Sequence, residues 1–269
     1  GRTTIPDEVA AESGVGVAIA GPAVIVNTLE LTGTVQAEPS KISEVRARFP
    51  GVVQRILHDI GDEVRAGAVL AVVESNESLR RYNVTAPIGG LIVDRNLQVG
   101  QVAADEPLYR IVDLSTVWVQ LDVLGRSAAR IAAGQPVRIV TLDGHEADGA
   151  LDWLSPLVAH GSQSQRARVP LPNPLRQLRP GQFVRGIVTT DTAEVPLAVR
   201  LSGLQTLRDF DVVYEKIGST YEVRMLTLGR RDRDHVEVLD GLSAGAAYVA
   251  DNSYLIKADI DKSGAGHDH

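Results

Sequence analysis

The sequence predicts a mainly β protein of several small domains, and three observations support this prediction. The 269 residues include 25 glycines and 13 prolines but only 4% aromatic side chains, a composition typical of short strands joined by tight turns. Apolar residues of the first half fall at nearly alternating positions between glycines, which is the period of a strand rather than a helix. The same half also contains an internal repeat, so several short elements share one pattern.

Composition and charge exclude several classes of protein. The net charge of −7 disfavours a nucleic-acid binder, and the most basic stretch, residues 230–234, has carboxylates between its arginines. The chain has no cysteine, so disulfides, thiolate metal sites and cysteine nucleophiles are excluded. The longest apolar run, Val15 to Val26, has 12 residues, whereas a membrane-spanning helix needs about 20. From the net charge and its distribution, we expect no nucleic-acid partner.

Catalytic motifs are missing as well. The sequence has no G-x-S-x-G, no phosphate-binding loop and no H-E-x-x-H, and its nearest approach, His145-Glu146-Ala147-Asp148, lacks the second histidine. Acidic and basic side chains occur throughout, but no spacing marks an acid–base pair. We therefore expect a protein that is not an enzyme.

The repeat joins residues 51–73 (GVVQRILHDIGDEVRAGAVLAVV) to residues 90–112 (GLIVDRNLQVGQVAADEPLYRIV). The first two glycines of one copy, Gly51 and Gly61, align with Gly90 and Gly100 of the other at the same spacing. Each copy begins with alternating apolar residues, turns at its second glycine and closes with a short apolar strand. A copy of this length is too short to fold alone, so the two copies are expected to share one core.

The repeat resembles the lipoyl/biotinyl carrier fold, in which two interlocked half-motifs form one β-sandwich. Gly61-Asp62-Glu63-Val64-Arg65-Ala66-Gly67 resembles the G-D-x-V-x-x-G turn of its first half, and Ala86-Pro87-Ile88-Gly89-Gly90 resembles the A-P-x-x-G opening of its second. A carrier holds its cofactor on a lysine between the halves. The connecting residues, Glu74 to Asn83, contain no lysine. A cofactor-carrying enzyme subunit therefore remains only a distant alternative, and we expect no covalent cofactor.

The flanking sequence resembles the membrane fusion proteins, which are periplasmic adaptors of efflux pumps and use this fold without the lysine. Residues 29–38 (LELTGTVQAE) resemble the strand before the first half-motif. Residues 165–169 (QRARV) and 179–184 (RPGQFV) resemble the T-R-T-x-x-V and R-P-G-M-x-V signatures, with Gln165 and Gln182 as departures. The ending, residues 252–259 and 267–269, is most similar to adaptors of the cobalt-zinc-cadmium type, which serve resistance-nodulation-division (RND) transporters. About ten residues separate the halves, so the long α-hairpin of most adaptors is not expected.

The resemblance implies an elongated chain that runs out through its domains and returns. It places a membrane-proximal β-domain at residues 1–28 plus 193–262, a small β-barrel at 29–46 plus 113–192, and the lipoyl-like β-sandwich at 47–112. Residues 263–269 are expected to form a flexible tail. The sequence predicts a single helix, from Arg126 to Ala133, which is rich in alanine and ends at a glycine.

The resemblance also implies partners and location. The expected partners are an inner-membrane RND transporter, an outer-membrane channel and further copies of the chain, and the expected location is the periplasm, in association with the inner membrane. The expected function is to link transporter and channel for the export of divalent heavy-metal ions. An adaptor of the same fold for drug or peptide export is the alternative.

Candidate metal ligands follow from the histidines. His267-Asp268-His269 offers two imidazoles and a carboxylate, a donor set compatible with zinc. His145 with Glu146, His160, and His235 are further candidates, although each can equally be an ordinary surface residue. The only methionine, Met225, argues against a thioether site for Cu(I) or Ag(I), so zinc, cobalt, cadmium or nickel is expected as a transient ligand. Arg80 and Arg81, between the half-motifs, are candidate partner contacts, with solubility as the simpler explanation.

Overall fold

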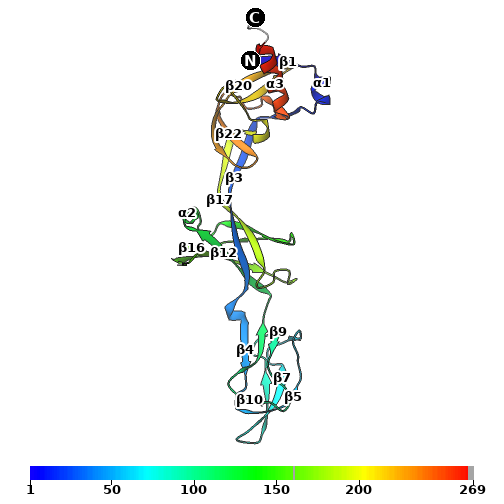
Figure 1. Ribbon diagram of the computed structural model, residues 1–269, viewed down its shortest axis with the longest axis vertical. Coiled ribbons are helices and arrows are strands. Elements are labelled where there is room, and N and C mark those ends of the chain that lie inside the picture. The colour runs from blue at the N-terminus through cyan, green and yellow to red at the C-terminus, as the bar shows by residue number, and fades with distance from the viewer. Residues whose placement is uncertain (160, 266–269) are drawn as a thin grey trace. The chain divides into compact units, whose positions relative to one another are not determined.

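The computed structural model describes residues 1–159 and 161–265, and Figure 1 shows the course of the chain. Strands make up 57% of the residues, which confirms the predicted mainly β class. The chain divides into two compact units: one contains residues 1–29 and 189–269, and the other contains residues 30–188. Strands β3 (Gly21–Ala37) and β17 (Phe183–Arg200) contribute to both units. Within the second unit, the predicted limits of the lipoyl-like and barrel domains stay a prediction.

The internal repeat folds as two four-stranded sheets in the order β10-β5-β7-β8 and β6-β9-β11-β4. Each copy places two of its strands in one sheet and its short middle strand in the other, so the halves interlock and neither sheet is complete without both copies. The strands are β4 (Ile42–Arg46), β5 (Gly51–Ile56), β6 (Glu63–Val64), β7 (Val69–Ser75), β8 (Arg81–Thr85), β9 (Gly90–Arg95), β10 (Val102–Ala103) and β11 (Pro107–Val112). The expectation of one shared sandwich is confirmed.

The two sheets enclose a single apolar core. Leu70 and Val73 from the first copy and Ile92 and Ile111 from the second are each fully buried in one cluster. Burying such side chains supplies roughly 1.5–3 kcal/mol each, and neither copy could supply the opposite wall of this core alone. The mutual burial therefore explains why the repeat must occur twice.

The aligned glycines serve two different purposes. A Cβ on Gly51 would lie 2.1 Å from the carbonyl oxygen of Glu74, and one on Gly90 would lie 2.6 Å from that of Val112, so these positions allow neighbouring strands to approach closely. Gly61 and Gly100 have open space around them but adopt φ values of +94° and +86°. Turns with positive φ favour glycine because it has no Cβ to clash with its own backbone.

The rest of the second unit is a sheet in the order β14-β13-β17-β3-β12-β16-β15. Strand β12 lies between β3 and β16, and its register aligns Val35, Val119 and Val169 in one row of fully buried valines. Alternate residues of β12 thus face the core, as the near period-2 pattern predicts. The strands not yet given are β12 (Thr116–Leu124), β13 (Pro136–Thr141), β14 (Glu146–Ala150), β15 (Trp153–Val158) and β16 (Ser164–Pro172).

The first unit contains a sheet in the order β1-β20-β19-β23-β2, and β18 pairs with β19. In addition, β22 pairs with the end of β17, and β21 pairs with β22. Helix α3 (Ser253–Ala265) packs Ile256 and Ile260 into the core of this unit, next to Ala10 of helix α1 (Asp7–Glu12). The strands are β1 (Arg2–Thr4), β2 (Gly16–Ile19), β18 (Gln205–Leu207), β19 (Phe210–Ile217), β20 (Thr220–Met225), β21 (Thr227–Arg231), β22 (His235–Asp240) and β23 (Ala247–Asp251).

The helix predictions were partly wrong. Helix α2 covers only Gly125–Ala128, not Arg126 to Ala133. Beyond it, the Gln135 side chain accepts from the backbone N–H of Ala132 and donates to the carbonyl of Arg130, so these backbone groups are bonded outside a helix. Helices α1 and α3 were not predicted. Residues 263–265 belong to α3 rather than to a flexible tail, because its apolar pair at i and i+4 anchors the helix to the core.

Two buried tyrosines allow a matched test of the packing. The Tyr109 hydroxyl donates to the carbonyls of Leu70, at 3.0 Å, and His58, at 3.2 Å, whereas the Tyr214 hydroxyl has no partner among the described residues. Burial raises the pKa of both phenols to about 12. We expect Tyr109→Phe to lower the free energy of unfolding by about 1–2 kcal/mol, and Tyr214→Phe to leave it unchanged or raise it. Urea denaturation of both variants measures this, and equal losses would contradict the assignment of partners.

Candidate functional site

The turn between the half-motifs has no lysine, the residue on which a carrier of this fold holds its cofactor. Strands β7 and β8 are joined directly by residues 76–80, with no helical hairpin between them. The buried Ser75 fixes this turn: its carbonyl accepts from the N–H of Leu79 at 2.9 Å, and its N–H donates to the carbonyl of Arg80 at 3.0 Å. The turn offers hydroxyl, amide, carboxylate and guanidinium groups, but no primary amine to acylate. A swinging-arm mechanism therefore has no attachment point here.

The two candidate partner-contact residues differ in their surroundings. The Arg81 guanidinium lies 3.2 Å from the carboxylate of Glu74 on the neighbouring strand, so it braces the hairpin. Arg80 is exposed and has no ion pair among the described residues, and it follows Leu79, which is 75% exposed. Arg80 is thus the better placed of the two to contact a partner.

The candidate metal ligands do not assemble within the described part of the chain. His145 lies at the turn between β13 and β14, where its backbone bonds to the Thr141 hydroxyl, and Glu146 is 3.9 Å from the Arg138 guanidinium. His235 belongs to the other unit. His160, His267, Asp268 and His269 lie outside the described residues. In the residues that are described, no three histidine, aspartate or glutamate side chains gather in a way that could hold a metal ion.

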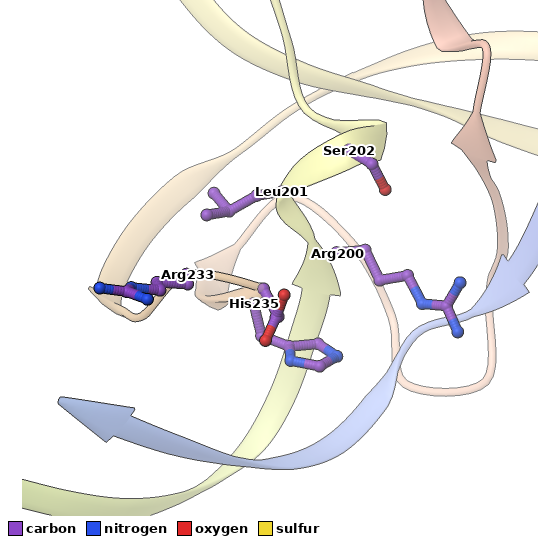
Figure 2. Close-up of a pocket in the computed structure, with 6 residues that line it drawn as sticks. Arg200, Leu201, Ser202, Arg233 and His235 are labelled. Carbon is purple, nitrogen blue, oxygen red and sulfur yellow. The ribbon is translucent and has the colours of Figure 1, made fainter. Parts of the chain in front are cut away.

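His235 instead lines a hollow of about 440 Å³ at the end of the β17–β22 ladder, here called the β17–β22 pocket (Figure 2). Arg200 and His235 are direct partners in the antiparallel register, so their side chains emerge next to each other. Arg233 comes from the turn between β21 and β22. The lining residues are Arg200, Leu201, Ser202, Arg233, Asp234 and His235.

Asp232 holds the turn beneath this pocket. Its carboxylate accepts from the backbone N–H groups of Val26 at 2.9 Å, Asp234 at 2.9 Å and His235 at 2.8 Å. Partial burial opposes its charge, but these donors outweigh that effect and hold the pKa of Asp232 below its usual value. The carboxylate thus fixes the backbone of the turn from which Arg233 and His235 project.

This contact predicts a pH dependence. Because the folded-state pKa of Asp232 is lower than the 3.8 of the unfolded chain, its stabilisation is complete above that value and is lost as the pH falls through the folded pKa. We expect Asp232→Asn to lower the free energy of unfolding by about 1 kcal/mol at pH 7. Between pH 5 and pH 3 the variant should lose less stability than the native chain. Urea midpoints across this range measure the difference, and parallel curves would contradict it.

A polar junction between the lipoyl-like sandwich and the sheet that follows it was not predicted from the sequence. Asn173 is 3% exposed, and its side chain bonds to the backbone of Leu178 at 2.8 and 3.0 Å and to the carbonyl of Leu114 at 3.2 Å. Nearby, the Lys41 ammonium contacts the Ser115 hydroxyl at 3.0 Å and the Asp113 carboxylate at 3.5 Å. The one available signal was an asparagine between two prolines, Pro172 and Pro174, which is typical of a fixed turn.

Hydrogen bonds also lower the pKa values of two acidic side chains at this junction. The backbone N–H of Ser115 donates to Asp113 and lowers the pKa of that carboxyl, while Ser40 and Thr116 donate to Glu38 and lower the pKa of that side chain. These hydrogen bonds therefore favour the ionised form of both acids at this junction.

Among the described helices, none is both long and apolar enough to cross a membrane.

Three protein-family models match consecutive stretches of the chain. They describe a CzcB-like barrel-sandwich hybrid domain at residues 41–113, a CusB-like β-barrel domain at residues 116–192, and a CzcB C-terminal circularly permuted SH3-like domain at residues 197–257. The first match contains the repeat, the second contains β12 to β16 and part of β17, and the third contains most of the membrane-proximal candidate domain. Together they follow the order of the folded parts along the chain.

Curated relatives give a consistent result. The chain is 25% identical over 341 aligned positions to the cation efflux system protein CzcB of Alcaligenes sp. (strain CT14), and the alignment covers all of this chain. The chain spans 66% of the length of that relative. It is also 23% identical to the nickel-cobalt-cadmium resistance protein NccB of Alcaligenes xylosoxydans xylosoxydans, with 97% of this chain and 83% of that protein covered.

Solved structures share the fold. ZneB from Cupriavidus metallidurans superposes with a TM-score of 0.55 at 19% identity, covering 94% of this chain and 97% of that one. MacA from Actinobacillus actinomycetemcomitans gives a TM-score of 0.60 at 15% identity, covering 86% of this chain and 99% of that one. At these identities the likeness shows the fold alone.

Proposed function

This chain belongs to the membrane fusion proteins of RND metal-efflux systems, and we propose that it acts as the periplasmic adaptor of such a pump. In this role it links an inner-membrane RND transporter to an outer-membrane channel. The observation that supports the proposal most strongly is the order of its parts. A lipoyl-type sandwich without an attachment lysine is followed along the chain by the stretches that match the CusB-like barrel model and the CzcB C-terminal domain model.

The physical basis of the proposal is a scaffold of packed strands in a chain whose sequence has no G-x-S-x-G, phosphate-binding loop or H-E-x-x-H. The repeat is fixed by one shared core, and its turn carries no modifiable amine. Strands β3 and β17 contribute backbone to both compact units. We propose that the chain is not an enzyme, lies in the periplasm next to the inner membrane, and works as several copies around one pump.

Divalent metal ions are proposed as the exported substrate because CzcB and NccB are named for resistance to, or efflux of, such ions. Growth tests this. A strain that carries the pump genes but lacks this one should become sensitive to zinc, cobalt, cadmium or nickel, and the intact gene should restore growth. Sensitivity to drugs alone would favour the alternative adaptor for drug export, and no sensitivity to either would contradict the adaptor role.

Direct binding of the metal by this chain is a separate proposal. The pair His267 and His269, with Asp268 between them, has the donor set for a weak, exchangeable zinc site, and it lies outside the described residues. Calorimetric titration of Zn²⁺ into the native chain should give heat that disappears in the double variant His267→Ala, His269→Ala. Unchanged heat in that variant would place the site elsewhere, and no heat in either protein would remove direct binding from the account.

A further inference from the structure

The β17–β22 pocket has a fixed frame. The backbone N–H of Leu201 donates to the carbonyl of Asp234 at 2.8 Å, and that of Arg200 donates to the hydroxyl of Tyr248 at 2.8 Å. The Tyr248 ring is itself buried, and Asp232 ties the β21–β22 turn to the N–H of Val26. The positions from which the lining side chains emerge are therefore set by the fold.

Two arginines and one carboxylate line this pocket, so its lining has a formal charge of +1 when His235 is neutral. Neither Arg200 nor Arg233 has an ion pair among the described residues, and the only carboxylate in the lining is that of Asp234. Asp232 is close and also charged, but its carboxylate accepts from three backbone donors and forms no ion pair with Arg200 or Arg233 among the described residues. Eight other arginines do have a carboxylate within 4 Å of the guanidinium. These are Arg46, Arg81, Arg95, Arg138, Arg168, Arg176, Arg185 and Arg224.

This charge argues against the metal site that His235 suggested from the sequence. A divalent cation beside two guanidiniums is repelled by both, and a single carboxylate does not offset that repulsion. The same groups suit an oxyanion. Guanidiniums form paired hydrogen bonds to phosphate oxygens, and the Ser202 hydroxyl and the His235 ring offer further donors at the same hollow.

We propose that the β17–β22 pocket is an anion site that binds a phosphate group through Arg200, Arg233 and His235. Figure 2 shows the two arginine side chains on either side of the His235 ring. Both arginines are exposed, so rotation of their long side chains can bring the guanidiniums to one phosphate or to two neighbouring ones. The phosphate can come from the free ion or from the headgroup of an anionic phospholipid, and the two sources are distinguished below. The proposal is independent of the metal-export role.

Inorganic phosphate and lipid vesicles are the probes. Titration of phosphate into the ¹⁵N-labelled full chain should shift the NMR signals of the His235 ring and the Arg200 side chain, and acetate at equal ionic strength should do so much less. In the double variant Arg200→Gln, Arg233→Gln, the phosphate affinity should fall about tenfold or more. Co-sedimentation with phosphatidylcholine vesicles, with and without phosphatidylglycerol, forms the second arm. There, each arginine removed should weaken binding about fivefold.

The matched control removes two other exposed, unpaired arginines, Arg55→Gln with Arg126→Gln, which keeps the same net charge as the test variant. Phosphate and phosphatidylglycerol binding that is lost only in the pocket variant supports a lipid headgroup, and phosphate binding alone supports the free ion. The proposal is overturned if phosphate does not bind, if acetate binds equally well, or if both double variants behave alike.

Discussion

Leu70→Ala is expected to lower the free energy of unfolding of the lipoyl-like sandwich by about 2–5 kcal/mol. Leu70 has no exposed surface and packs in the core that both copies of the repeat share, so its truncation leaves a cavity that neither sheet can fill alone. Its backbone carbonyl also accepts from Tyr109, and that contact remains in the variant. The loss therefore measures the core rather than the hydrogen bond.

Leu79→Ala is the matched control, because it removes the same atoms from a side chain that is 75% exposed in the β7–β8 turn. It should change stability by less than about 0.5 kcal/mol. Hydrogen–deuterium exchange of peptides covering β7 and β11 is the measurement. Faster exchange in both strands of the Leu70 variant is expected, since they come from different copies. Faster exchange in β7 alone would contradict a shared core.

Gly51→Ala should be the most damaging of the repeat's glycine substitutions. The added Cβ would lie 2.1 Å from the carbonyl oxygen of Glu74, so strand β5 would have to move away from β7. Overpacking of this kind costs about 1–3 kcal/mol, and more where the obstacle is backbone. We expect a lower urea midpoint for this variant than for Gly61→Ala, whose Cβ meets no atom.

The Gly61 substitutions separate crowding from backbone strain. Gly61 has φ +94°, so Gly61→Ala should cost about 1–2 kcal/mol through strain alone. Gly61→Asn should cost less, because asparagine tolerates positive φ better than alanine. At Gly51 the order of the two variants reverses: Gly51→Asn should be less stable than Gly51→Ala, since the larger asparagine meets the same carbonyl. A Gly51→Asn variant as stable as Gly61→Asn would contradict the close approach of the strands.

The sandwich could be predicted because its pattern is local. Glycines at fixed spacing and alternating apolar residues indicate where each strand begins, and the repeat predicts that two halves share a core. The helix predicted from residue 126 was too long because the Gln135 side chain bonds to backbone groups of Arg130 and Ala132. The periodicity of the sequence does not reveal this competition. Helix α3 was not predicted because the burial of its two isoleucines, Ile256 and Ile260, depends on a core formed by strands far away in the sequence.

The candidate site was harder to predict from the sequence, because its properties depend on which charged side chains lie next to each other in the fold. His235 has the chemistry of a metal ligand in the sequence, and only the β17–β22 register shows that Arg200 lies directly beside it. Similarly, the two tryptophans of the chain are 35 positions apart. In the structure both flank Arg168, whose guanidinium carbon is 4.3 Å from the ring centroid of Trp118 and 5.8 Å from that of Trp153.

The adaptor role rests on one physical requirement, which is that a single chain holds two membrane proteins at once. Affinity purification of the full chain from cells that express the whole pump, after mild cross-linking, tests this most directly. We predict that an RND transporter and an outer-membrane channel elute together with the native chain, and that the Leu70→Ala variant recovers less of the channel. Recovery of neither membrane protein with a folded, native chain would contradict the account.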